Sequence, residues 1–153
     1  MKARIETVID CSREHLWNFL EDPENLALWV KGLVDFKLTS PPPHGAGSSY
    51  VMRMKEGGRI NEYQGRNLTW DPPSHIREEM WGGRLKKGKI MADYLMVAEG
   101  VRTRLIYSSE FQGGGLLMRA LGPIFSVVHR SYCRSMIQRL KKMAEQTARK
   151  DGA

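Results

Sequence analysis

Cysteine is scarce in this sequence of 153 residues, and long apolar runs are missing. The two cysteines, Cys11 and Cys133, form no Cys-x-x-Cys motif and no cluster with histidine, so we expect reduced thiols in a cytoplasmic protein that holds no metal ion or other cofactor. No run of about 18 apolar residues is present that would span a membrane. The opening residues, MKARIETVIDCS, lack the apolar stretch of a secretory signal, so none is expected. The 41% hydrophobic and 27% charged residues exclude wholesale disorder.

Acidic residues are also scarce in the last quarter of the chain. Residues 115–153 hold 8 Lys/Arg against 2 Asp/Glu, whereas residues 1–114 hold 16 against 15. The net charge of +7 is therefore concentrated in this last segment. A basic segment can attract nucleic acid or anionic lipid headgroups, or it can be the solvated face of a helix.

The first 30 residues combine one strand with two short helices. Residues 3–10 alternate between apolar and polar side chains, which is typical of a half-buried strand. Ser12 can cap the helix that follows, in which apolar residues between 16 and 20 recur at helical spacing. The pair Asp22-Pro23 ends this helix and starts a second one, because aspartate is a good N-cap and proline suits the first helical turn.

Six further strands are predicted, because the period of the pattern then changes to two, except that residues 59–70 alternate poorly and their inner face is not assigned. Turns rich in proline or glycine separate them, such as PPPHGAG at 41–47. The expected strands cover residues 34–39, 50–55, 59–70, 75–82, 88–98 and 101–111. In the strand 75–82, Ile76 and Met80 point to one face and Trp81 to the other.

From residue 116 to about 148 the period becomes helical. An apolar stripe recurs at steps of three or four, formed by Leu121, Phe125, Val128, Tyr132, Met136, Leu140 and Met143. Pro123 predicts a kink or a break near residues 119–123. Basic residues cluster on roughly the opposite face, at Arg119, Arg130, Arg134 and Lys141.

This order of elements predicts an α+β fold, with residues 1–150 in a single domain. Hairpin-length connections imply an antiparallel sheet, and the last helix is the only element large enough to cover one of its faces. We therefore expect a helix-grip: a seven-stranded antiparallel sheet wrapped around a long C-terminal helix, with two short helices after the first strand. A curved sheet closed by a helix often leaves an interior space, and apolar pockets of this kind are the default ligand sites.

Several segments resemble START-like (Bet v 1-like, SRPBCC) proteins. SREHLWNFLEDPENLALW, from Ser12 to Trp29, resembles the opening of that superfamily, with Trp17, Asp22, Pro23 and Trp29 at matching places. NLTWDPPSHI resembles its strand–turn–strand with a double proline, and GGGLLMRALGPIFSVVHRSYCRSMIQRLKKMAE resembles its C-terminal helix. The resemblance covers essentially the whole chain and is greatest for the bacterial polyketide cyclase/dehydrase and lipid-transport group. It implies the helix-grip fold and assigns no catalytic residue, because the matching positions are mostly packing residues.

Aromatic residues and methionines dominate the predicted inner surface, and they are the candidates for the lining of a ligand cavity. Methionine is flexible and polarisable, so it adapts to irregular apolar ligands. The candidates are Tyr50, Met52, Met54, Met80, Tyr94, Met96, Leu105, Tyr107, Phe125, Val128 and Tyr132. The alternative is that these side chains fill an ordinary core.

The polar residues of the predicted inner surface form no legible catalytic set. Tyr94 and Tyr107, on neighbouring strands, are candidates for orienting a ligand, because a buried phenol needs a partner. His129 lies one residue off the apolar stripe and is a general-base candidate if it reaches the cavity. His44 lies in the 41–47 loop, which is a candidate lid. Each of these residues can equally be structural.

The basic face of the last helix has no interleaved aromatic residues for base stacking, and the sequence has no helix-turn-helix or zinc-finger pattern. We therefore expect no nucleic-acid partner. Arg119, Arg130, Arg134 and Lys141 are candidates for weak contact with an anionic membrane, the alternative being a solvated outer face.

The sequence thus predicts that the protein binds, or transports, a small hydrophobic or lipid-like molecule in a cavity between the sheet and the last helix. An alternative is a polyketide cyclase/aromatase-like enzyme, in which a tyrosine or histidine of the same cavity transfers a proton. The lack of a visible acid–base pair counts against it. A second alternative is a noncatalytic module that associates with membranes.

Overall fold

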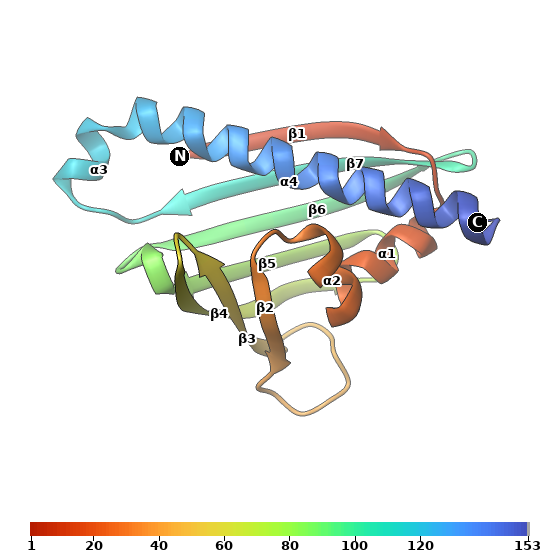
Figure 1. Cartoon of the computed structure of the whole chain (residues 1–153), viewed down its shortest axis with the longest axis horizontal. Coiled ribbons are helices and arrows are strands. Elements are labelled where there is room, and N and C mark those ends of the chain that lie inside the picture. Colours follow the sequence, from red (N-terminus) through yellow and green to blue (C-terminus); the bar gives the residue numbers. More distant parts are fainter. Residues whose placement is uncertain (153) are drawn as a thin grey trace.

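The described part of the chain forms seven strands and five helical segments (Figure 1). The computed structural model describes residues 1–152. The strands are β1 (Lys2–Ile9), β2 (Leu33–Leu38), β3 (Ser49–Glu56), β4 (Arg59–Asp71), β5 (His75–Gly82), β6 (Lys89–Glu99) and β7 (Arg102–Gln112). The helical segments are α1 (Arg13–Glu21), α2 (Pro23–Trp29), the 3-10 turn η1 (Gly83–Leu85), α3 (Leu116–Ala120) and α4 (Gly122–Asp151).

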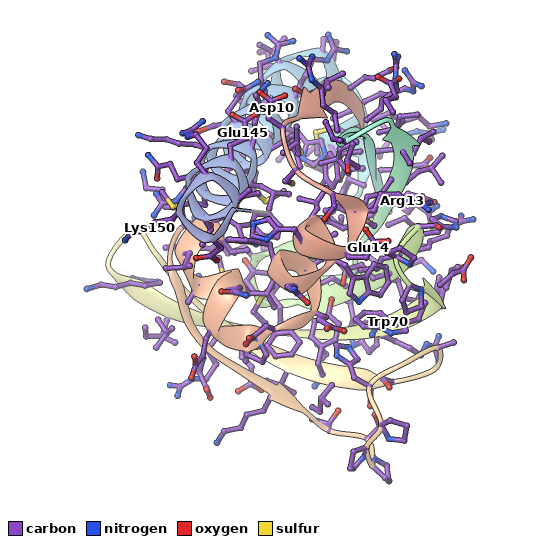
Figure 2. The ribbon with its side chains drawn as sticks, turned by 90° about the vertical axis from the view of Figure 1, so that its right-hand side faces the viewer. Asp10, Arg13, Glu14, Trp70, Glu145 and Lys150 are labelled. Carbon is purple, nitrogen blue, oxygen red and sulfur yellow. The ribbon has the colours of Figure 1, made fainter. Side chains whose placement is uncertain are left out.

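The strands form one antiparallel sheet in the order β1-β7-β6-β5-β4-β3-β2. From β2 to β7 each strand pairs with the next strand of the chain, while β1 pairs with β7 at the far side of the sheet. The helices α1 and α2 therefore carry the chain from one edge of the sheet to the other. Figure 2 shows the sheet curving around the helices. The predicted seven-stranded antiparallel sheet, with a long C-terminal helix and two short helices after the first strand, is confirmed.

The two short helices are fixed by the residues that the sequence indicates. The Ser12 hydroxyl caps α1 by accepting a hydrogen bond from the His15 backbone N–H, at 3.1 Å. Asp22 ends α1 and caps α2, because its carboxylate accepts a hydrogen bond from the Glu24 N–H at 2.9 Å. Pro23 occupies the first turn of α2, where its missing N–H costs nothing. The buried side of α1 consists of Leu16, Trp17, Phe19 and Leu20.

The second half of α4 is anchored to the rest of the protein. Lys141 Nζ donates a hydrogen bond to the Val8 carbonyl oxygen at 2.8 Å. The Glu145 carboxylate accepts one from the Asp10 N–H at 3.2 Å, and Figure 2 shows these two residues side by side. The buried side of this half recurs at steps of three or four and consists of Ile137, Leu140, Ala144 and Ala148, in line with Cys133 in the first half. Apolar packing and polar contacts thus hold the same half of the helix.

The first half of α4 turns a different side to the sheet from the one that the sequence predicts. His129 faces β7, with its Nε2 3.1 Å from Ser109 Oγ, and Ser126 is half-buried. Phe125 and Val128, which belong to the predicted stripe, are exposed. The prediction was wrong by one residue, which is about 100° around a helix. Its physical cause is that the side approaching the sheet is small or polar here, whereas the prediction followed the largest side chains.

A break separates α3 from α4, as Pro123 predicts. Helix α3 ends at Ala120, and α4 begins at Gly122 with Pro123 in its first turn. Helix α4 then continues without interruption for 30 residues. Within residues 1–152, no helix combines the length and the apolarity that crossing a membrane requires.

Replacing Leu140 by alanine is expected to lower the free energy of unfolding by about 2–5 kcal/mol, because the truncation leaves a cavity in the packed half of α4. Leu140 is fully buried. The matched control is Leu117→Ala, whose side chain is exposed and whose effect should stay below about 0.5 kcal/mol. Urea unfolding followed by tryptophan fluorescence measures both variants. Equal effects would contradict the assignment of the two environments.

Candidate functional site

A cavity of about 340 Å³ lies between the concave face of the sheet and the helices α2 and α4. Strands β2 to β7 contribute side chains to its wall, and apolar residues predominate. Seven of the predicted lining residues belong to this wall: Tyr50, Met52, Met54, Met80, Tyr94, Tyr107 and Tyr132. A concave, mostly apolar space with few polar groups has the character of a small-molecule site.

The other four predicted lining residues lie elsewhere. Met96 and Leu105 are neighbours across β6 and β7 and are fully buried in the core. The α1 helix and the second half of α4 fill the concave face at that end, which leaves no space beside them. Phe125 and Val128 lie outside the wall because the first half of α4 is rotated, as described above. Val128 is 61% exposed.

A carboxyl group that the sequence reasoning missed lies in the wall of the cavity. Glu78, on β5, accepts a hydrogen bond from the Tyr50 hydroxyl through Oε2, at 2.7 Å. The signal for it was present in the sequence. The predicted alternation of β5 puts Ile76 and Met80 on the inner face, and Glu78 lies between them with the same phase.

Burial controls the protonation of this pair. Desolvation raises the pKa of the Glu78 carboxyl, and the hydrogen bond from Tyr50 opposes this rise only in part. Desolvation also raises the pKa of the Tyr50 hydroxyl well above its usual value, and the neighbouring carboxylate raises it further. The phenol therefore remains a donor, while Glu78 can accept a hydrogen bond from a ligand or exchange a proton with it.

A second polar group of residues lies where α4 meets β7. His129 Nε2 is 3.1 Å from Ser109 Oγ and 3.7 Å from Cys133 Sγ. The Cys133 sulfur is also 3.9 Å from the Tyr107 hydroxyl. Desolvation lowers the pKa of His129 and raises the pKa of Cys133, so the neutral imidazole faces a thiol rather than a thiolate. All four residues line the cavity.

His44 closes one side of the cavity from the loop between β2 and β3. Its ring packs on Trp70, with 4.0 Å between the ring centroids, and its Nε2 lies 2.8 Å from Asn67 Nδ2. Desolvation lowers the pKa of His44. A neutral ring held by an indole and an amide fixes this loop against β4. No three His, Cys, Asp or Glu side chains of the described chain gather as ligands for a metal ion.

Comparison with known proteins gives a family and a fold. The family described as polyketide cyclase/dehydrase and lipid transport matches residues 1–145. No curated protein matches the chain.

Solved structures match over nearly the whole chain at low sequence identity. A protein from Thermus thermophilus has a TM-score of 0.75 at 14% identity, with 97% of this chain and 99% of that chain covered. Ara h 8.0201 has a TM-score of 0.72 at 10% identity, with 94% and 97% covered. A point mutant of Thalictrum flavum norcoclaurine synthase, in complex with a transition-state analogue, has a TM-score of 0.69 at 16% identity, with 96% and 95% covered. At these identities the matches show the fold alone, which is the Bet v 1-like helix-grip.

Glu78→Gln is expected to raise the free energy of unfolding at pH 7 and to change it less at pH 4. The folded-state pKa of Glu78 lies above its ordinary value, so its ionisation destabilises the folded state as the pH rises through the unfolded-state value and beyond. Glutamine removes that cost and keeps an acceptor for Tyr50. Urea unfolding at the two pH values measures the change, with the exposed Glu62→Gln on β4 as the matched control. A loss of stability at pH 7 would contradict the raised pKa.

Proposed function

The chain belongs to the polyketide cyclase/dehydrase and lipid transport family, and from this premise we propose that it binds, or transports, a small hydrophobic molecule in the cavity. The observation that carries the proposal is the apolar cavity of about 340 Å³, with the hydrogen-bonded pair Tyr50 and Glu78 in its wall. Burial of apolar ligand surface would drive binding, at roughly 25 cal/mol per Å².

The polar pair selects the chemistry of the ligand. A half-buried carboxylate that receives a single hydrogen bond from the protein still has lone pairs to share, and leaving them without partners costs free energy. We propose that the ligand donates a hydrogen bond to Glu78 through a hydroxyl or amine group. The remainder of the ligand would contact the methionines and tyrosines of the wall, whose flexible or flat side chains adapt to its shape.

2-Naphthol is expected to bind about ten-fold more tightly than naphthalene, because its hydroxyl can donate to Glu78 and a hydrogen bond to a charged group contributes about 1.5–3 kcal/mol. Isothermal titration calorimetry at pH 8 compares the two. In Glu78→Leu the difference should vanish while naphthalene still binds. Equal affinities for wild-type protein would contradict the role of Glu78.

A pair of alanines on β6 tests whether the cavity is the binding site. Ala92 lines the cavity and Ala98 is exposed. Ala92→Trp should fill the space and abolish the binding of both compounds, whereas Ala98→Trp should bind them as the wild type does. Binding retained by a folded Ala92→Trp protein would contradict the cavity as the site.

We propose as a second candidate an enzyme of the polyketide cyclase/aromatase kind. The observation that favours it is Glu78, since a carboxylate with a raised pKa is a stronger base than an ordinary one. Glu78 would take a proton from the carbon between two carbonyl groups of a poly-β-keto chain and leave an enolate. The cavity wall would hold the chain in a folded conformation.

Deuterium exchange into benzoylacetone tests this second candidate without a known substrate. Wild-type protein in D₂O should speed the exchange of the C–H between the two carbonyls, and the rate should rise with pH as Glu78 ionises. Glu78→Leu should leave only the rate of the buffer. Proton NMR follows the exchange. Equal rates with the two proteins would contradict catalysis and would leave the binding proposal intact.

We also propose that contact with an anionic membrane involves Arg119, Arg130 and Arg134. Lys141, the fourth residue expected in this role, is engaged elsewhere, because it binds the Val8 carbonyl oxygen and lies 3.6 Å from the Glu145 carboxylate. We further propose that residues 1–150 form a single domain. We also propose a cytoplasmic location, where the two buried thiols stay reduced.

A further inference from the structure

Large apolar side chains are exposed over α3 and the first half of α4. Leu116 and Leu117 are 83% and 71% exposed, and three residues of α4 are 61–68% exposed: Ile124, Val127 and Val128. We call residues 116–128 the apolar arm. Figure 1 shows α3 and the start of α4 at the end of the molecule opposite the C-terminus. Apolar side chains gathered on a surface mark an interaction site, whereas single ones do not.

One side of the apolar arm continues into the wall of the cavity. Leu121, Phe125, Val128, Tyr132 and Met136 follow one another at steps of four, three, four and four, so they share one face of the helix. Tyr132 and Met136 line the cavity. Tyr132 is also 51% exposed, so it lies at the rim. A continuous apolar face therefore leads from solvent to the cavity.

The charges of the chain segment that contains the apolar arm have a single sign, although Asp93 and Glu110 of the sheet line one hollow with Arg130 and Arg134. Residues 111–144 contain six Lys/Arg and no Asp/Glu. Lys141 and Arg139 are engaged with backbone carbonyl groups of Val8 and Leu28. The cations beside the arm, Arg119, Arg130 and Arg134, are exposed and form no ion pair within the described residues.

A second basic segment lies near the start of the arm. Lys86 and Lys87, which follow η1, are exposed, and Arg84 is exposed within it. This segment adjoins the end of β7, because a Cβ added at Gly113 would lie 2.9 Å from the Cα of Gly88. Apolar residues of the arm are thus accompanied by cations from two parts of the chain.

We propose that the apolar arm inserts into the surface of an anionic lipid bilayer. Apolar residues of an interfacial helix enter the boundary between headgroups and acyl chains, while arginine side chains extend to the phosphates. An anionic leaflet neutralises the cations around the arm. A second copy of the chain fits the same surface less well, because it would bring two sets of these arginines together.

The inference rests on the membrane contact proposed above and specifies which residues enter the bilayer, and it gives a hydrophobic ligand a route that avoids water. The face shared by Phe125, Val128 and Tyr132 would lie against the bilayer at one end and open into the cavity at the other. A ligand leaving the membrane along this face would exchange lipid contacts for contacts with the protein.

Sedimentation with phosphatidylcholine vesicles, with and without phosphatidylserine, tests the inference. Wild-type protein should bind the vesicles that contain phosphatidylserine. Leu117→Gln/Val127→Gln should weaken this binding about ten-fold or more, because two buried apolar side chains are lost. Arg130→Gln/Arg134→Gln should weaken it about five-fold per arginine, and only where phosphatidylserine is present.

The matched control is Val97→Gln/Val101→Gln. Both side chains are exposed, on β6 and in the turn after it, outside the arm. This variant should bind vesicles as the wild type does. Thermal unfolding checks that every variant is folded, and calorimetry with 2-naphthol reports on the cavity. If Leu117→Gln/Val127→Gln loses vesicle binding but still binds 2-naphthol, the result supports the inference. It also shows that the apolar arm and the cavity act separately.

Two results would overturn the inference. The first is vesicle binding that is absent in the wild type or equal in wild type and Leu117→Gln/Val127→Gln. The second is a wild-type dimer in multi-angle light scattering that this variant converts to a monomer while vesicle binding is unchanged. That outcome would assign the surface to a second copy of the chain.

Discussion

The packing of α4 against the curved sheet is the interaction on which the other features depend. Ile137, Leu140 and Ala144 fill the concave face near α1 and leave no exposed surface there. In its first half the helix approaches the sheet through His129 and Cys133, and smaller or polar side chains fill less volume. The cavity is the space that this half leaves open, so its existence depends on which residues α4 turns inward.

Unfilled space also lowers the free-energy cost of placing a carboxyl group inside the protein. In a packed core, Glu78 would lose its hydration with Tyr50 as its one partner, and its charge would be strongly unfavourable. Beside a cavity, water or a ligand can complete its hydrogen bonds. The cavity therefore reduces the loss of stability that the Glu78 carboxyl group causes. Under the proposed function, the carboxyl in turn makes a mostly apolar space selective among apolar molecules.

Local signals predicted the fold because single residues carry them: Ser12 and Asp22 begin helices, and alternation defines the strands. The site was harder to predict for two physical reasons. Alternation predicts which face of the sheet a side chain lies on, but not whether that part of the strand borders the cavity or the packed core. Met96 and Leu105 lie on the same face as the lining residues and yet belong to the core. Hydrophobic periodicity predicts that the face of a helix with the largest apolar side chains is buried. In the first half of α4, the buried face is instead the one whose smaller side chains allow the helix to approach the sheet closely. The alternation of β5 was enough to place Glu78 on the inner face. Its hydrogen bond with Tyr50 was not predictable, because the two residues lie 28 positions apart in the chain.

The continuity of α4 has a mechanical consequence. The helix is one rigid rod of 30 residues, held along its second half and supported lightly along its first. Any tilt of this helix would therefore pivot about the packed region that begins near Cys133. Tyr132 and Met136 lie beside that region and form part of the cavity wall. A displacement of the first half of α4 would then change the width of the cavity beside Tyr132 and Met136, whatever exerts the force.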